Sequence, residues 1–160
     1  MIPKDALQKI LTKEISTTLK VLRAYPDDKN DFKPHEKSSD VKKLASTFVF
    51  EMYLLEMYLF GEAMDRSRFQ TYKPENIQAA ADDFETESSR IITRFEQMNE
   101  EDLNKTVSFA GHTFAADEFM LMMIFDQIHH RGQMTIYVRM AGGKVPSIYG
   151  PSADDPSTNF

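Results

Sequence analysis

The sequence contains no cysteine. This absence excludes disulfide bridges, thiolate metal ligands and a cysteine nucleophile, and it fits a reducing compartment. A membrane-spanning run is also missing, because Glu51, Glu56 and Asp126 interrupt the longest apolar stretches. The amino-terminal stretch MIPKD lacks the apolar core of a signal peptide. We therefore expect a cytoplasmic protein that makes no contact with a membrane.

Clusters of basic residues and glycine-rich phosphate loops are missing as well. The chain has 19 Lys and Arg against 25 Asp and Glu, which gives a formal net charge of −6. Without a basic stripe there is no electrostatic footprint for nucleic acid, so we expect no nucleic-acid partner. No serine or threonine lies in a strand–turn–helix elbow, which argues against a nucleophilic hydroxyl enzyme.

The composition and length of the chain predict one globular domain over residues 1–160. Hydrophobic residues make up 41% and charged residues 28% of the 160 residues. That composition is typical of a soluble folded protein, and the length is enough to bury a core without staples.

Apolar residues recur at helical spacing in four segments, and no long segment alternates like a strand. The predicted helices run from Asp5 to about Ala24, from Ser39 or Asp40 to Gly61, from Tyr72 to about Asn99, and from Thr113 to Met140. A polar loop over residues 26–39, a short extended turn over 105–113 and a proline-containing tail after 143 connect or follow them. The sequence thus predicts an all-α, four-helix up-down bundle with a longer crossover loop and an irregular C-terminal tail.

The last predicted helix carries polar residues inside an apolar run. Steps of three and four residues give one stripe: Phe119, Met123, Asp126, His130, Gln133, Tyr137 and Met140. Asp126 and His130 lie one above the other on this helix, and carboxylate and imidazole groups are ordinary ligands of divalent metals. A third ligand must come from a facing helix, where Thr47 and Glu51 are the polar candidates.

A simpler interpretation of this stripe needs no ligand. Asp126 could bond to His130 or pair with an arginine, and so only satisfy buried polar groups. His129 points about a quarter-turn away, where it packs or faces solvent. We expect Arg131 and Arg139 on outer faces, as partners in salt bridges. The residue pattern alone leaves both interpretations open.

Several sequence runs resemble the DinB/YfiT-like family of four-helix metalloenzyme-type proteins. The most specific is HHRGQMT at 129–135, followed by YVR at 137–139 and GGKVP at 142–146. LRAYPDDK at 22–29 and PHEKS at 34–38 resemble the first loop of that family, and residues 44–51 resemble the start of its second helix. The resemblance covers nearly the whole chain in the right order, and it implies the same bundle.

The resemblance also implies a metal site. Family members hold a divalent metal with one histidine on the second helix and two histidines four residues apart on the last. His130 matches the last ligand, whereas Asp126 and Thr47 stand at the other two places. The resemblance therefore implies a degenerate site for nickel, zinc or a similar metal, weak or empty. The pocket between the second and last helices is expected to include Glu51, Gln133 and Tyr137.

Two functions follow from this resemblance. The first is a small-molecule, metal-dependent enzyme of thiol transferase or hydrolase type, or its relic, with the metal at Asp126 and His130. The alternative is a metal-free binding or structural bundle that has lost the family's chemistry. Thr47 favours the alternative, unless Glu51 reaches inward and replaces the missing ligand. If the chain binds metal tightly, Glu51 or His35 becomes the suspected third ligand.

We predict a homodimer, because the second helix carries large apolar residues on more faces than one core can cover. The residues concerned are Phe48, Phe50, Tyr53, Leu54, Tyr58 and Phe60. The contact is expected on the first two helices. Analytical ultracentrifugation at micromolar concentration should show a species of twice 18.4 kDa, and a single 18.4 kDa species would contradict the prediction.

Overall fold

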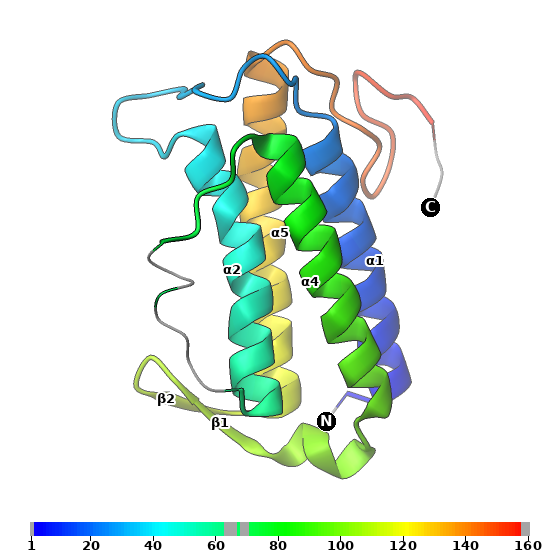
Figure 1. Cartoon of the computed structure of the whole chain (residues 1–160). Helices are drawn as coiled ribbons and strands as arrows, with labels where there is room; N and C mark the ends of the chain where they lie inside the picture. Colours follow the sequence, from blue (N-terminus) through cyan, green and yellow to red (C-terminus); the bar gives the residue numbers. More distant parts are fainter. Residues whose placement is uncertain (1, 63–66, 68–70, 158–160) are drawn as a thin grey trace.

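The computed structural model describes residues 2–62, 67 and 71–157. Its long helices are α1 (Lys4–Arg23), α2 (Val41–Phe60), α4 (Ile77–Gln97) and α5 (Ala116–Met140). They stand side by side as a bundle (Figure 1). A short 3-10 helix, Glu100–Asn104, and a small hairpin lie between α4 and α5. The predicted four-helix bundle is confirmed.

The helices do not follow one another around the bundle in chain order. Each helix packs against two neighbours, in the cyclic order α1, α4, α2, α5, so α1 and α2 lie diagonally opposite each other. In Figure 1, α1 and α5 run in one direction and α2 and α4 in the other. The longer crossover therefore lies between the parallel helices α2 and α4, over residues 61–76. The polar loop over residues 26–39 joins two antiparallel helices.

Side-chain caps fix where the middle helices begin. The Asp40 carboxylate accepts a hydrogen bond from the Lys43 backbone N–H at 2.8 Å, and the Asn76 side chain accepts one from Ala79 at the same distance. The third long helix thus begins after Asn76 and not at Tyr72. Gly61, with φ of 71°, ends α2 in the left-handed conformation that glycine adopts without strain.

A two-stranded hairpin replaces the extended turn that the sequence suggested. Strands β1 (Thr106–Phe109) and β2 (His112–Ala115) pair antiparallel. The turn residues Ala110 and Gly111 have φ of 51° and 80°, as a type I′ turn requires. Thr113 pairs with Ser108 in this hairpin, so it does not cap the last helix, which begins at Ala116.

The hairpin and the segment around Tyr72 cover the aromatic residues of α2. The Phe109 ring lies 5.3 Å from Tyr58, and the Tyr72 ring lies 5.7 Å from Phe50. Phe48 is fully buried against Phe84. The six apolar residues that motivated a dimer contact are therefore buried or half-buried within the chain itself.

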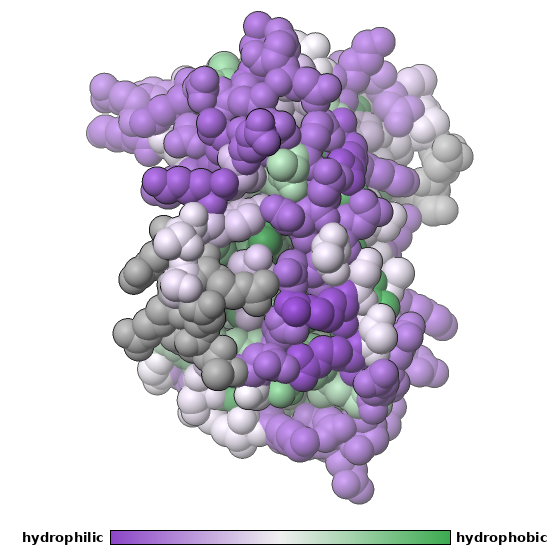
Figure 2. All heavy atoms as spheres, viewed as in Figure 1, coloured by the Kyte–Doolittle hydropathy of each residue, from purple (hydrophilic) through white to green (hydrophobic). Residues whose placement is uncertain are grey.

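The most exposed apolar side chains of the described helices lie on α5, whereas Ile10 on α1 is 38% exposed. Phe125, Ile136 and Met140 are 63%, 51% and 55% exposed, and the spacing of Phe125 and Ile136 places them on one outer face. The homodimer stays a prediction, and these exposures favour α5 as its contact surface. Hydrophilic residues dominate the face over α4 seen in Figure 2. Within the described residues, no helix has both the length and the apolar character needed to cross a membrane.

Arg131 lies in the core and not on an outer face, which corrects the sequence-based expectation. Its guanidinium donates to the Glu14 carboxylate at 2.7 Å and to the Glu14 carbonyl and Thr18 hydroxyl at 3.2 Å each. Tyr149, in the C-terminal tail, donates to the same carboxylate at 2.6 Å. One buried ion pair therefore joins α1, α5 and the tail. Arg139 behaves as expected and pairs with Asp154 at 2.8 Å near the surface.

Replacing Arg131 with methionine should lower the free energy of unfolding by about 3–5 kcal/mol, because it leaves the buried Glu14 carboxylate without its cationic partner, with only the Tyr149 hydroxyl still donating to it. Arg139→Met is the matched control on the same helix and should cost at most about 1 kcal/mol, as partly exposed pairs do. Urea denaturation followed by circular dichroism measures both. Equal losses in the two variants would contradict the assigned role of Arg131.

Candidate metal centre

The antiparallel packing of α2 and α5 brings three potential ligands to one level of the bundle. Glu51 comes from α2, and Asp126 and His130 come from successive turns of α5. One ligand atom of each residue lies within 4.8 Å of the others. That spacing allows all three to reach a single ion after small side-chain adjustments. The two polar residues that the sequence singled out on the last helix are thus joined by Glu51.

The ligand atoms of this cluster lack hydrogen-bond partners among the described residues. Glu51 is only 2% exposed, and neither of its carboxylate oxygens has a partner in hydrogen-bond geometry, although the Gln127 side chain is near enough to favour the charged carboxylate. The buried Nδ1 of His130 is also unbonded. The His130 Nε2 lies 3.6 Å from Asp126 Oδ1, which is too long for a hydrogen bond. Arg131 pairs with Glu14 and not with Asp126. The simpler interpretation therefore does not account for these atoms, and unbonded buried polar atoms require an explanation.

Burial raises the pKa of the Glu51 carboxyl well above its ordinary range. Loss of hydration is the largest cause, and the negative charge of Asp126 adds to it. The Gln127 side chain acts in the opposite direction. A divalent cation beside these groups would lower the pKa of the Glu51 carboxyl, because its charge favours the ionised carboxylate.

The orientation of Gln127 is set by the Arg131 ion pair. A guanidinium only donates, so the Thr18 hydroxyl must accept from Arg131 and use its own hydrogen for the Gln127 side-chain oxygen, 3.1 Å away. The NH₂ group of the buried Gln127 amide is then the part left to face other groups, and it favours the charged form of Glu51. Sequence inspection missed Gln127, although its place next to Asp126 inside the apolar run was a usable signal.

The Thr47 hydroxyl has a hydrogen-bond partner within its own helix. The residue is half-buried on α2, one turn before Glu51, and its hydroxyl donates to the Lys43 carbonyl at 3.3 Å. That bond uses the hydroxyl hydrogen and leaves the oxygen lone pairs, so Thr47 as a ligand stays a prediction. His35 is exposed, and its Nδ1 accepts from the Lys37 backbone N–H at 3.1 Å. Between Glu51 and His35, the two suspected third ligands, only Glu51 belongs to the cluster.

The remaining residues expected around the site make their contacts elsewhere. Gln133 is exposed and lies 2.8 Å from His129 Nε2, so it contacts the neighbouring histidine and not His130. Tyr137 is buried, and its hydroxyl donates to the Ser39 carbonyl at 2.8 Å, which fastens the loop before α2. Their place in a pocket around the cluster stays a prediction.

These features define a four-helix bundle with a carboxylate–imidazole cluster between two facing helices. The model of the DinB family matches residues 4–159. The chain therefore belongs to the DinB family, as the sequence runs around His130 suggested.

Individual relatives agree with this assignment. The uncharacterized protein YrdA of Bacillus subtilis is 32% identical over 83 residues, which are 51% of this chain and 50% of that protein. A DinB-like protein from Bacillus cereus has the same fold, with a TM-score of 0.81 at 21% identity over 91% of this chain and 97% of its own. YfiT from Bacillus subtilis gives 0.65 at 11% identity over 89% of this chain and 91% of its own, and is described as a probable metal-dependent hydrolase with an unusual four-helix bundle topology.

Substituting Glu51 with glutamine should stabilise the metal-free protein at neutral and alkaline pH. Because the folded-state pKa of Glu51 is raised, its contribution to stability is complete below the unfolded-state pKa and is lost as pH rises through the folded-state pKa. Glutamine keeps the group neutral, so the advantage of Glu51→Gln should grow with pH. Thermal melts between about pH 5 and 8 in the presence of chelator measure it.

Glu56→Gln is the matched control for this experiment. Glu56 is also buried on α2, but Arg90 and Arg94 neutralise it. Its substitution should lower the melting temperature, because Arg90 and Arg94 lose the buried carboxylate that they share and keep only Glu87 and Glu62, respectively. If Glu51→Gln is as destabilising as Glu56→Gln across the whole pH range, the Glu51 carboxyl is paired, and the description above is wrong.

Proposed function

We propose that this DinB protein binds a divalent metal ion through Glu51, Asp126 and His130. We propose further that it acts as a metal-dependent hydrolase of small molecules. The observation that carries the proposal is the set of buried, unbonded ligand atoms from two facing helices. Burying such atoms without partners is costly, and a bound cation is the partner that suits two carboxylates and an imidazole together.

The ligand chemistry favours zinc or nickel. One imidazole nitrogen and two carboxylate oxygens match sites for zinc and its neighbours in the first transition row. Three protein ligands are typical of catalytic sites, which keep a position open, whereas structural sites use four. The side chain of Asp126 is 48% exposed, so the open position would be reached from the outer surface between α2 and α5.

When bound, the ion would polarise a substrate oxygen or activate a water molecule. The chain's own residues prepare this chemistry. Glu51 presents a carboxylate from a dry environment, and Gln127, held by Thr18 and Arg131, favours its charged form. A thiol transferase differs only in the group that is activated. Since the chain has no cysteine, the thiol of such a reaction must arrive as a second substrate.

The departures from the family's histidine pattern fit the same proposal. Thr47 stands where the resembling family keeps a histidine, and Glu51 comes one helical turn later on the same helix. A longer carboxylate side chain one turn away can occupy the place that a histidine would fill. The description of YfiT as a probable metal-dependent hydrolase belongs to that protein, and it supports the reaction class proposed for this one.

A metal-free binding or structural bundle is the second candidate. The raised pKa of Glu51 favours it, because a protonated carboxyl is a poor ligand and lowers metal affinity. The two candidates differ in one measurable property, namely whether a metal stabilises the folded chain.

Zinc or nickel should stabilise chelator-treated protein by about 2.7 kcal/mol at a free metal concentration of 100 Kd, because only the folded state presents all three ligands. Glu51→Gln and His130→Gln should remove most of this gain. Thr47→Val is the matched control on α2 and should keep it. The affinity should rise with pH, since metal binding displaces a proton from Glu51. Urea denaturation with and without metal measures the stabilisation, and calorimetric titration at several pH values measures the affinity.

Two results would contradict the proposal. If Thr47→Val loses metal binding and Glu51→Gln retains it, the third ligand is Thr47, at the position where the family has its histidine, and not Glu51. No stabilisation by zinc, nickel, manganese or iron(II) would favour the metal-free candidate. Hydrolysis of a panel of small esters and amides, with and without metal, then tests whether a bound ion is catalytic.

A further inference from the structure

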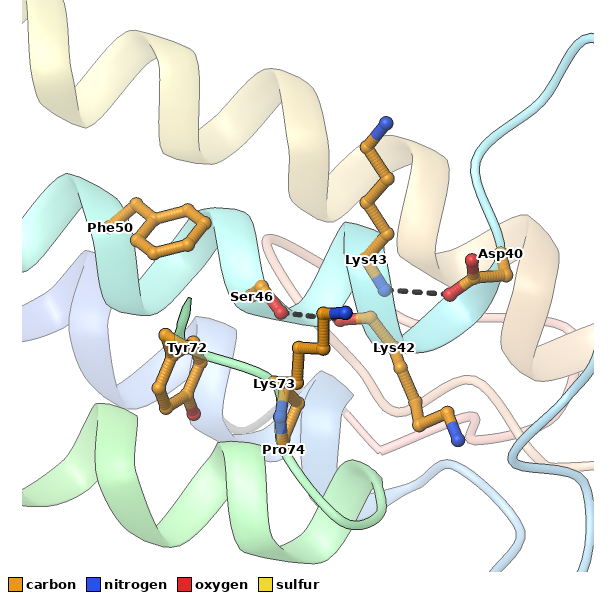
Figure 3. Close-up of a pocket in the computed structure, with 8 residues that line it drawn as sticks. All are labelled: Asp40, Lys42, Lys43, Ser46, Phe50, Tyr72, Lys73 and Pro74. Atoms are coloured by element: carbon orange, nitrogen blue, oxygen red, sulfur yellow. Dashed lines mark hydrogen bonds between the residues drawn. The ribbon is translucent and has the colours of Figure 1, made fainter. Parts of the chain in front are cut away.

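A second hollow lies on the outer side of α2, away from the metal centre. It has a volume of about 440 Å³ and forms where residues 72–74 pass beside the first turns of α2 (Figure 3). Its described lining consists of Asp40, Lys42, Lys43, Ser46, Phe50, Tyr72, Lys73 and Pro74. None of these residues belongs to the Glu51 cluster, which faces α5. The volume lies in the range of small-molecule sites, roughly 300–1,000 Å³.

The lining is positively charged although the protein is acidic. Three lysines stand against one aspartate here, whereas the whole chain carries a net charge of −6. The Asp40 carboxylate is engaged as the cap of α2. Lys42 has an ion pair with the almost fully exposed Asp31, which screens its charge little. Lys73 has no ion pair within the described part of the chain, and its side chain reaches toward α2 beside Ser46, so an entering anion meets an unneutralised cation there (Figure 3). The Lys43 side chain extends toward α5, away from the 72–74 segment.

One end of the hollow is aromatic and held in place. The Phe50 and Tyr72 rings lie 5.7 Å apart at 73°, and the buried Pro74 adds a rigid apolar wall. The Tyr72 hydroxyl donates to Asp83 at 2.8 Å, which fixes the ring. Burial and Asp83 raise the pKa of Tyr72, so this wall stays neutral. Aromatic side chains with few rotatable bonds provide contact area at low entropic cost.

The cationic and aromatic parts lie next to each other. In Figure 3 the Lys73 side chain extends from the 72–74 segment toward the first turns of α2, where Ser46 lies, and the two rings lie on the other side of Ser46. A bare inorganic anion would use only the lysines, and a neutral ring would use only the aromatic wall. A ligand that carries both parts uses the whole lining.

We propose that this hollow binds a small organic anion in which a phosphate or carboxylate group is attached to a flat ring. Lys73 and Lys42 attract the anionic group, and Phe50 with Tyr72 contacts the ring. The site is separate from the metal centre, because none of its lining residues belongs to the Glu51 cluster.

Amide chemical shifts of ¹⁵N-labelled protein test this proposal, with chelator present so that the metal centre takes no part. Phenyl phosphate, benzoate and inorganic phosphate are titrated separately. Saturable shifts are expected at Ser46, Phe50, Tyr72 and Lys73 for at least one of the two ring-bearing anions, and the stronger of them identifies the anionic group. Inorganic phosphate should bind at least roughly fivefold more weakly, since it lacks the ring contact.

Lys73→Gln should weaken the binding of the ring-bearing anion roughly fivefold, the effect of one lost charge near the surface. Lys9→Gln, which removes an exposed lysine of α1, is the matched control and should leave it unchanged. The proposal is overturned if no shift saturates, if inorganic phosphate binds equally well, or if the two variants behave alike. The spectra of the variants themselves report whether each remains folded.

Discussion

The buried ion pair between Arg131 and Glu14 fixes how α5 is rotated within the bundle. Because Arg131 must point toward α1 to meet Glu14, the residue before it, His130, turns about 100° away, toward α2. Asp126, one helical turn earlier, follows it to the same side. Thr18 and Gln127 continue the bonding from the ion pair into the core. The position of the candidate ligands thus depends on a charge pair that is not itself part of the site.

The sequence predicted local features well, but not contacts between residues far apart in the chain. Helical spacing of apolar residues located four helices to within a few residues, because such spacing directly reflects burial of one face. The stripe through Asp126 and His130 was visible for the same reason. Arg131 was misassigned to the surface, since a local pattern shows that a charge is present but not that Glu14, far along the chain, neutralises it.

The third ligand shows the same limit. Sequence resemblance pointed to Thr47 on the second helix, because alignment compares positions and not side-chain directions. Glu51 was only an alternative, and its inward direction depends on how α2 packs against both α4 and α5. The crossover between α2 and α4 and the hairpin that covers Tyr58 were likewise products of chain topology and of a short turn at Ala110 and Gly111. Neither has a strong local signal.

Helix α2 therefore has two chemically different sides. Toward α5 it presents a dry carboxylate, and toward solvent it presents lysines and an aromatic ring over the hollow beside Pro74. Its apolar remainder is covered by the chain's own hairpin and the Tyr72 segment, which leaves the exposed apolar residues of α5 as the open surface. One helix of a bundle can thus carry residues for separate functions on different sides.

The most direct test of the metal centre is a crystal structure of the unsubstituted chain grown with zinc or nickel, with anomalous data collected at the metal edge. The account predicts one strong anomalous peak between α2 and α5, about 2.0–2.2 Å from a carboxylate oxygen of Glu51, a carboxylate oxygen of Asp126 and a ring nitrogen of His130. An occupied site without Glu51 among its ligands, or the absence of a peak between these helices at saturating metal, would contradict it.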